Sequence, residues 1–337
     1  MVSIKDIAEK CGVSIATVSK ALNNHNDVNE NTKKFIEQTA KELGYFPNSQ
    51  ARALKTNKTF SIGVIYTEKA GSGIAHSYFS GVLESFRAEA EKLGYDITFI
   101  NNGNIGGTSM SYLEHCRYRN VDGVALVCAD FYDREINDLM NSDIPLVNID
   151  FSSEKYYSVC SDNTMGMKRL VEYVYSKGHR DIAYIYGDSS QVTTDRLNSF
   201  KNTMQELGLV PNLDYVKQGK YQDILNVYDI ALNMLKLYNP PTCIIAPDDF
   251  SALGVFNAVK EVGLSIPKDI SVVGYDGIYL SQVIGKPLTT IKQNVALIGK
   301  RSAQLLVKII NKKSLSEKEN HLIIGGELLV GETVGAI

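Results

Sequence analysis

Cysteine and histidine are both scarce in this chain of 337 residues. The five cysteines are odd in number and form no Cys-x-x-Cys pair, and the five histidines are scattered without the spacing of metal ligands. Paired cysteines and Cys/His clusters mark disulfide frameworks and structural metal sites. We therefore expect reduced thiols, no bound metal and no cofactor.

Long apolar runs and catalytic signatures are missing as well. No run of about 18 apolar residues could span a membrane, and no charged-then-apolar segment opens the chain. We therefore expect a cytoplasmic protein that does not contact a membrane. The first strand is not followed by Gly-x-Gly-x-x-Gly, and the chain lacks the phosphate-loop, Gly-x-Ser-x-Gly and His-Glu-x-x-His motifs. These absences favour a binding protein over an enzyme.

Charge is nearly balanced but unevenly distributed. The net charge is −3, yet residues 1–58 hold nine Lys and Arg against six Asp and Glu, and the rest of the chain holds 26 against 32. A basic N-terminal part on an acidic body is expected when only that part meets phosphates. With 44% hydrophobic residues, a chain of this length suits two or three domains with their own cores.

Residues 3–22 carry the pattern of two short helices joined by a tight turn. Ser3, with Asp6 three residues later, is a start signal for the first helix. Gly12 stands where that helix must end, and Ser14 can cap a second one. Apolar residues recur on one face of the first helix at helical spacing: Ile4, Ile7, Ala8 and Cys11. Those of the second helix that face the first are Val18, Ala21 and Leu22. The pattern predicts a helix-turn-helix, whose second helix enters the major groove of DNA, and is more specific than that of an ordinary helical hairpin.

A third helix is expected after the segment 28–32, followed by Gly44 in the position just past its end. Its predicted inner face consists of Phe35, Ile36, Thr39, Ala40 and Leu43. The following segment reads Tyr-Phe-Pro-Asn-Ser-Gln-Ala-Arg-Ala-Leu-Lys over residues 45–55. Asn48 can cap one or two further helical turns there, which are too short to be stable alone.

These motifs resemble those of the lactose/galactose-repressor family of bacterial transcription regulators. The resembling segments are Ile4 to Ala8, Val13 to Ser19, and Leu43-Gly44-Tyr45 through Pro47-Asn48 to Ala51-Arg52-Ala53-Leu54, and the likeness continues through nearly the whole chain. The resemblance implies a homodimer that binds double-stranded operator DNA through the following residues of the second helix and of a hinge helix: Ser14, Ile15, Ala16, Thr17, Ser19, Lys20, Asn23, Asn48, Ala51, Arg52, Leu54 and Lys55. Leu54 is then placed as an apolar wedge in the minor groove, and Arg52 and Lys55 can meet phosphates.

Past Lys58 the sequence alternates buried strands with amphipathic helices, which predicts parallel βαβ units with helices on both sheet faces. The expected strands are 61–66, 96–101, 123–127, 145–149, 182–186, 242–246 and 271–274. The expected helices are 78–93, 165–176, 196–207, 224–237, 251–262 and 296–310.

About 280 residues of this pattern suit two lobes rather than one sheet, and the body resembles the sugar-binding proteins of the periplasm. The expected division is a head and hinge helix over 1–58, a first lobe over 60–162 plus about 293–322, and a second lobe over 163–292 plus about 323–337.

Ligands of such folds bind in the crevice outside the carboxyl ends of the strands. Position after a strand and the family resemblance together indicate these effector-binding residues: Tyr78, Phe79, Asp150, Arg196, Tyr221, Asp248, Asp249, Asp276 and Gln293. Carboxylates and an arginine can form hydrogen bonds with vicinal hydroxyls, and an aromatic ring can cover the apolar face of a sugar.

Some of these assignments have structural alternatives. Asp249 can instead cap the helix that follows it, and Tyr78 and Phe79 can instead belong to the core. The loop 68–76 is longer than the resemblance suggests and can reshape the cleft mouth. Residues 127–129, Val-Cys-Ala, offer little hydrogen bonding at the end of their strand, which leaves a purine-type effector open.

The sequence therefore predicts a homodimeric, DNA-binding transcription regulator, most simply a repressor, that is controlled by a small sugar or sugar derivative. The alternatives are the same regulator with a purine-type or other co-repressor, and a sugar-binding protein without a DNA function.

Overall fold

The structure is a computed structural model that describes residues 2–23, 25–46, 58–67, 73–283 and 285–337. It divides into two compact units, Met1–Thr59 and Phe60–Ile337, which we call the head and the body.

The head contains helices α1 (Ile4–Cys11), α2 (Ile15–Leu22) and α3 (Glu30–Glu42). The carboxylate of Asp6 accepts hydrogen bonds from the backbone N–H of Ser3 at 2.8 Å and from its hydroxyl at 2.9 Å, which fixes the start of α1. Gly12 ends α1 in the left-handed conformation with φ of 64°, and the hydroxyl of Ser14 accepts the N–H of Thr17 at 3.1 Å to begin α2. The predicted helix-turn-helix is confirmed.

The head packs around a small apolar core. It is built from all three helices and consists of Ile7, Ala8, Val18, Ala21, Val28, Ile36 and Ala40. One expected member is wrong, because Phe35 is 53% exposed. Burial on α3 follows Lys33, Ile36 and Ala40, and Phe35 is turned about 100° away from Ile36 on an α-helix. Gly44 follows α3 with φ of 66°, as predicted.

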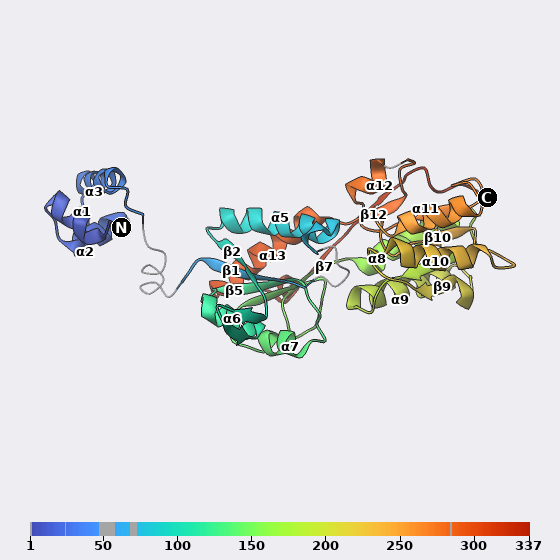
Figure 1. Ribbon diagram of the computed structural model, residues 1–337, viewed down its shortest axis with the longest axis horizontal. Helices are drawn as coiled ribbons and strands as arrows, with labels where there is room; N and C mark the ends of the chain where they lie inside the picture. Colours follow the sequence, from blue (N-terminus) through green and yellow to red (C-terminus); the bar gives the residue numbers. More distant parts are fainter. Residues whose placement is uncertain (1, 24, 47–57, 68–72, 284) are drawn as a thin grey trace. The chain divides into compact units, whose positions relative to one another are not determined.

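The first lobe of the body is a parallel sheet covered by helices on both faces (Figure 1). Its strands run in the order β13 (His321–Ile324), β7 (Ser158–Ser161), β6 (Leu146–Ile149), β5 (Gly123–Cys128), β1 (Ser61–Tyr66), β2 (Asp96–Ile100). One face packs on α5 (Ser77–Lys92) and α13 (Val295–Ile310), the other on α6 (Tyr112–Arg119) and α7 (Arg134–Met140). The short elements η1 (Gly73–Ala75) and α14 (Glu317–Asn320) precede α5 and β13.

The second lobe repeats this arrangement with a parallel sheet in the order β11 (Ser271–Val273), β10 (Cys243–Ile245), β8 (Ile182–Tyr186), β9 (Val216–Gln218). Helices α8 (Asn163–Ser176) and α9 (Gln191–Glu206) cover one face, and α10 (Ile224–Leu235) and α11 (Ala252–Glu261) the other. The remaining elements are η2 (Leu213–Tyr215) and α12 (Tyr279–Val283). The predicted two-lobed, doubly wound body is confirmed.

Three segments carry the chain between the lobes. The first joins β7 to α8, and the other two contain β12 (Thr290–Lys292) and β14 (Glu327–Leu329), which pair antiparallel. Because β13 pairs with β7 in the first sheet as far as Ile324, the last segment leaves that sheet after this residue.

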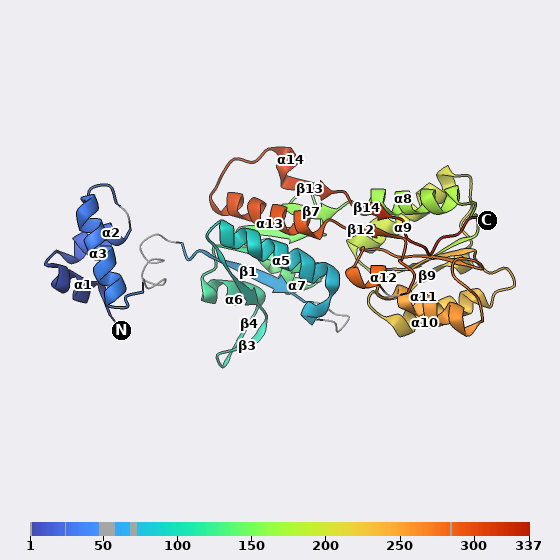
Figure 2. The same ribbon diagram turned by 90° about the horizontal axis from the view of Figure 1, so that it is seen from above.

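A small antiparallel hairpin, β3 (Gly103–Ile105) and β4 (Thr108–Met110), projects from the first lobe and was not anticipated (Figure 2). Among the described residues, no helix is both long enough and apolar enough to cross a bilayer.

Candidate functional site

The head presents one exposed helix face that contains the predicted base-reading residues. Ile15, Ala16 and Lys20 are exposed on α2, as is its N-cap residue Ser14, and Ala16 and Lys20 lie on the side opposite the buried Val18. Ser14 and Thr17 already bond to each other, since their hydroxyl oxygens are 2.8 Å apart. Asn23, the C-cap residue of α2, donates its side-chain amide N–H to the carbonyl of Ser19 at 2.6 Å. The cap bonds therefore fix both ends of a helix whose outer face stays open.

Lys20 is not free in the head. Its ammonium group lies 2.5 Å from a carboxylate oxygen of Asp27 in the loop that follows α2, and both side chains are about half exposed. The predicted hinge residues Asn48, Ala51, Arg52, Leu54 and Lys55 lie outside the described residues.

The body contains a cavity of about 810 Å³ between its lobes, at the carboxyl ends of the parallel strands. Seven of the nine predicted effector residues line it: Tyr78, Phe79, Asp150, Arg196, Tyr221, Asp276 and Gln293. Its wall also contains the end of β5 and the segments that follow β1, β5, β8 and β9; Val127 and Cys128 end β5, and Ala129 follows it. Residues 68–72 of the long loop lie outside the described residues.

On the first-lobe side, Asp150 and Tyr78 form a pair. Asp150 follows β6 with φ of 57°, a backbone conformation that is uncommon for residues other than glycine. Its Oδ1 accepts the backbone N–H of Ser161 at 2.9 Å, and its Oδ2 accepts the hydroxyl of Tyr78 in a short hydrogen bond. Burial raises the pKa of the Asp150 carboxyl, against the lowering effect of these bonds. The backbone and the phenol together orient the carboxylate in the cavity wall.

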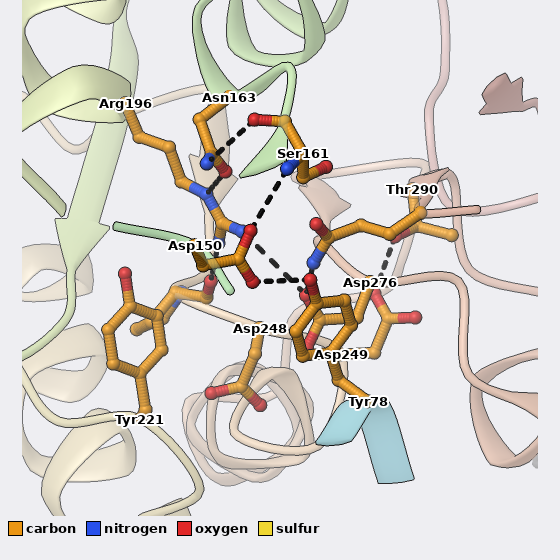
Figure 3. A network of polar contacts seen from close by, with 12 residues as sticks. Tyr78, Asp150, Ser161, Asn163, Arg196, Tyr221, Asp248, Asp249, Asp276 and Thr290 are labelled. Carbon is orange, nitrogen blue, oxygen red and sulfur yellow. Dashed lines mark hydrogen bonds and ion pairs between the residues drawn. The ribbon is translucent and has the colours of Figure 1, made fainter. Parts of the chain in front are cut away.

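On the second-lobe side, Arg196 lies buried within α9 (Figure 3). The sequence pattern predicted that this helix starts at Arg196, but it begins at Gln191, because the hydroxyl of Ser190 accepts the N–H of Thr193 and caps it. Nε of Arg196 donates to Oδ1 of Asn163 at 2.8 Å, and the guanidinium carbon lies 3.5 Å from the centre of the Tyr275 ring. Arginine only donates and stays protonated, so this group is a fixed cation in the cavity wall.

Asp276 faces Arg196 across the wall. Its Oδ1 lies 3.9 Å from Nη2 of Arg196 and accepts the amide N–H of Gln293 at 2.7 Å. Burial raises the pKa of the Asp276 carboxyl well above its usual value, while Arg196 acts in the opposite direction. The other amide atom, Oε1 of Gln293, is buried with no hydrogen-bond partner among the described residues. Asp276 and Oε1 of Gln293 can therefore still form hydrogen bonds with a ligand.

Two predicted carboxylates do not line the cavity. Asp248 accepts the N–H groups of Gln222 and Ser251, and so it fastens the start of the α11 segment to the loop after β9. Asp249 accepts hydrogen bonds from the N–H of Ile278 and from the hydroxyls of Ser281 and Thr290. Its lone pairs are directed at these three donors inside the lobe. Asp249 does not cap α11, as the alternative had it, since the N-cap residue is Ser251 and the N–H of Ser251 bonds to Asp248.

Aromatic rings complete the wall. The hydroxyl of Tyr221 lies 2.8 Å from that of Thr193, and the ring packs so close to Gly187 that a β-carbon there would lie 2.2 Å from it. Phe131 and Phe151, which sequence reasoning missed, stack with centres 4.1 Å apart and planes 9° from parallel. Both residues come shortly after predicted strands. That position in the sequence is the signal that could have identified them as cavity residues.

Asn163 and Tyr275 were also missed. Neither stands out in the sequence, because their role depends on Arg196, a residue far away along the chain. Among the described residues, no group of His, Cys, Asp and Glu side chains is arranged to hold a metal ion.

Comparisons with known proteins agree with this architecture. Residues 3–48 match the family model described as bacterial regulatory proteins, lacI family, and residues 171–334 match that of a periplasmic binding protein-like domain. The HTH-type transcriptional repressor PurR of Pasteurella multocida is 32% identical, with 99% of each chain covered. The protein of the same name from Histophilus somni is 33% identical, again over 99% of each chain.

Solved structures show the same likeness over the whole chain. The lac repressor dimer bound to operator and the anti-inducer ONPF has a TM-score of 0.84 at 25% identity, with 99% of both chains covered. A complex of the transcriptional regulator CelR with cellobiose has a TM-score of 0.72 at 23% identity, covering 99% of this chain and 100% of that chain. A helix-turn-helix head, a two-lobed body and relatives that match end to end lead to one conclusion. The chain belongs to the lacI family of bacterial regulatory proteins and is a DNA-binding transcriptional repressor.

Proposed function

We propose that this repressor is controlled by a small sugar or sugar derivative that binds in the cavity between the lobes of the body. The observation that carries the proposal is the convergence of Arg196, Asp276 and Asp150 on one cavity from two lobes. A ligand held by all three bridges the lobes. Its binding energy can then favour one lobe arrangement over another, which is the requirement for an allosteric switch.

The chemistry of the wall favours a polyhydroxylated ligand. A hydroxyl group both donates and accepts, so it can donate to Asp276 or to Oε1 of Gln293 while it accepts from Arg196. The ring of Tyr221 offers an apolar surface on the same wall. The cavity volume of about 810 Å³ falls in the range of small-molecule sites.

A purine is the second candidate. The segment Val127–Ala129 lines the cavity with few hydrogen-bonding groups, which suits an apolar ligand edge. However, Phe131 and Phe151 stack on each other rather than leave a slot between them for a planar base. The curated relatives carry the name PurR, so this class has its own arm in the experiment.

On the DNA side, the proposed contacts are the exposed residues of α2. Ile15 can pack on a thymine methyl, and Lys20 can donate to the acceptor edge of a guanine once it leaves Asp27. The hinge residues from Asn48 to Lys55 are proposed to join the contact when two copies bind a two-fold symmetric operator, as in a homodimer. A repressor of this kind acts in the cytoplasm, where its operator is, and without turnover of the effector.

Two measurements on the full-length protein test the proposal. The melting temperature is recorded with D-glucose, D-galactose, D-ribose, sucrose and cellobiose, and separately with adenine, guanine and hypoxanthine. Binding to the folded state raises it according to ligand concentration and Kd. The operator is found by selection from randomised DNA, and the best ligand must change operator affinity. A shift with purines alone overturns the sugar assignment, and a ligand that binds without changing operator affinity overturns the control mechanism.

A further inference from the structure

Arg196 and Asp276 form an ion pair that is close but not closed. Nη2 of Arg196 and Oδ1 of Asp276 are 3.9 Å apart, although both side chains are more than 90% buried. A charge-assisted hydrogen bond between such groups normally has a length of about 2.7–2.9 Å. Closing the gap would strengthen the Coulomb attraction in a medium of low dielectric constant. Something therefore holds the two charges apart.

Arg196 is held by partners that are closer to it than Asp276 is. The bond from its Nε to Oδ1 of Asn163, at 2.8 Å, is shorter than its contacts with the carbonyl of Pro247, at 3.4 Å, and with Asp276. The ring of Tyr275 lies against the guanidinium plane. Tyr275 fits there because residue 166 is glycine, where a β-carbon would lie 2.1 Å from the Tyr275 hydroxyl.

Asp276 is held from its own side by Gln293. The amide of Gln293 donates at 2.7 Å to the same Oδ1 that faces Arg196. Each member of the ion pair therefore has a neutral amide partner that is closer than the opposite charge. Figure 3 shows Arg196 between Asn163 and Asp276.

The orientation of the Asn163 amide is fixed by its two partners. Arginine can only donate, so the oxygen of Asn163 must face Nε of Arg196. The nitrogen then donates to the carbonyl of Ser161 at 3.2 Å. The backbone N–H of Ser161, at the end of β7, bonds to Asp150 in the same first lobe. Asn163 thus anchors Arg196 to the first segment that joins the lobes.

From these contacts we infer that Asn163 is a positioning residue that keeps the Arg196–Asp276 pair open, so that an effector hydroxyl can insert between the two charges. The inference rests on the proposed function of the cavity. Without Asn163, Nε of Arg196 loses its partner, and the guanidinium moves to Asp276. The two charges then satisfy each other, and a ligand must break a direct ion pair before it can bind.

The first test needs no effector. In a crystal structure of Asn163→Ala without ligand, the distance between Nη2 of Arg196 and Oδ1 of Asp276 is expected to fall below about 3.2 Å, a direct hydrogen bond. A pair that stays near 3.9 Å overturns the inference. If Asn163→Ala does not fold, Asn163→Ser replaces it, because the serine hydroxyl is too short to reach Nε. This readout decides the inference even if no sugar or purine of the panel binds.

The second test uses whichever member of the panel above raises the melting temperature most, with Kd measured by calorimetry. Asn163→Ala is expected to raise Kd at least tenfold. In an Arg196→Lys background, which has no Nε to hold, Asn163→Ala is expected to change Kd less than twofold. Full additivity of the two changes would mean that Asn163 acts on general stability, and that result overturns the inference.

Asn294 provides a matched control. It begins α13 after the second connection between the lobes, where its Oδ1 accepts the N–H of Leu297 at 3.0 Å. Asn294→Ala is expected to lower the melting temperature through the lost cap and to leave Kd within twofold. An effect on Kd equal to that of Asn163→Ala would show that any weakened helix start reduces binding, which contradicts a specific role.

Discussion

Tyr78 donates its hydroxyl hydrogen to Asp150 across a buried part of the cavity wall, in the first lobe of the body. The pKa of the Tyr78 phenol is raised well above its usual value, first by burial and then by the negative charge of Asp150. Tyr78 therefore stays protonated and serves as a permanent donor. Tyr78, for which the sequence left a place in the core as the alternative, thus orients the carboxylate of Asp150, which is a candidate ligand-binding group.

Tyr78→Phe is expected to destabilise the body by about 1–3 kcal/mol, because it leaves a buried acceptor without its donor. The free energy of unfolding is measured in urea. Tyr112→Phe is the control, since Tyr112 is also a buried tyrosine but lies on α6. Equal losses in the two variants would show that the bond to Asp150 has no special weight.

Asp276→Ala is expected to abolish the response to the effector without releasing DNA. The carboxylate is one of the groups that an effector hydroxyl would contact, and its removal leaves a repressor fixed in its ligand-free state. Operator binding is measured by fluorescence anisotropy with and without the effector. The melting temperature without ligand must stay unshifted, and a response at wild-type effector concentrations would place the site elsewhere.

Lys20→Ala is expected to weaken binding to the selected operator by about 1–3 kcal/mol and to relax base choice at one position. Lys20 must exchange its contact with Asp27 for a base edge, so Asp27→Asn is expected to tighten binding by a smaller amount. Selection from randomised DNA gives the base preference of each variant. An unchanged preference in Lys20→Ala would mean that this residue contacts only phosphates.

The buried Asp249 is expected to make stability depend on pH. Burial raises its pKa from 3.8 to about 7, against the lowering effect of the hydroxyls of Thr290 and Ser281. A raised pKa means that the folded state holds the proton more tightly than the unfolded state. This contribution, at most about 4 kcal/mol, is therefore complete below about pH 4 and is lost as pH rises through about 7.

Urea unfolding of the wild type and of Asp249→Asn at pH 5 and pH 8 isolates this contribution. The wild type is expected to lose more stability between the two values than the variant, which has no proton to release at this position. Parallel changes in the two proteins would assign the pH dependence to other groups.

The sequence alone determined the head and the layout of the body. The helix caps and the turn of the head are formed by Ser3, Gly12 and Ser14, which interact only with residues close to them in the sequence. They can therefore be predicted without knowledge of tertiary contacts. The alternation of strands and helices likewise indicates a parallel sheet, and the carboxyl ends of its strands indicate the cavity. The predictions made from these patterns were correct because the patterns depend on residues that are close together in the sequence.

Only the tertiary structure determined which of the predicted side chains line the cavity. Asp248 and Asp249 follow a strand as Asp276 does, yet donors from Gln222, Ile278 and Thr290 direct both of them into the lobe. No local pattern predicts that, because those donors are distant in sequence: Gln222 and Ile278 lie in loops, and Thr290 lies in β12. The same holds for Asn163, whose contact with Arg196 spans 33 residues. Their position after a strand selected the candidate carboxylates, but only the packing of segments that are distant in sequence fixed where their lone pairs point.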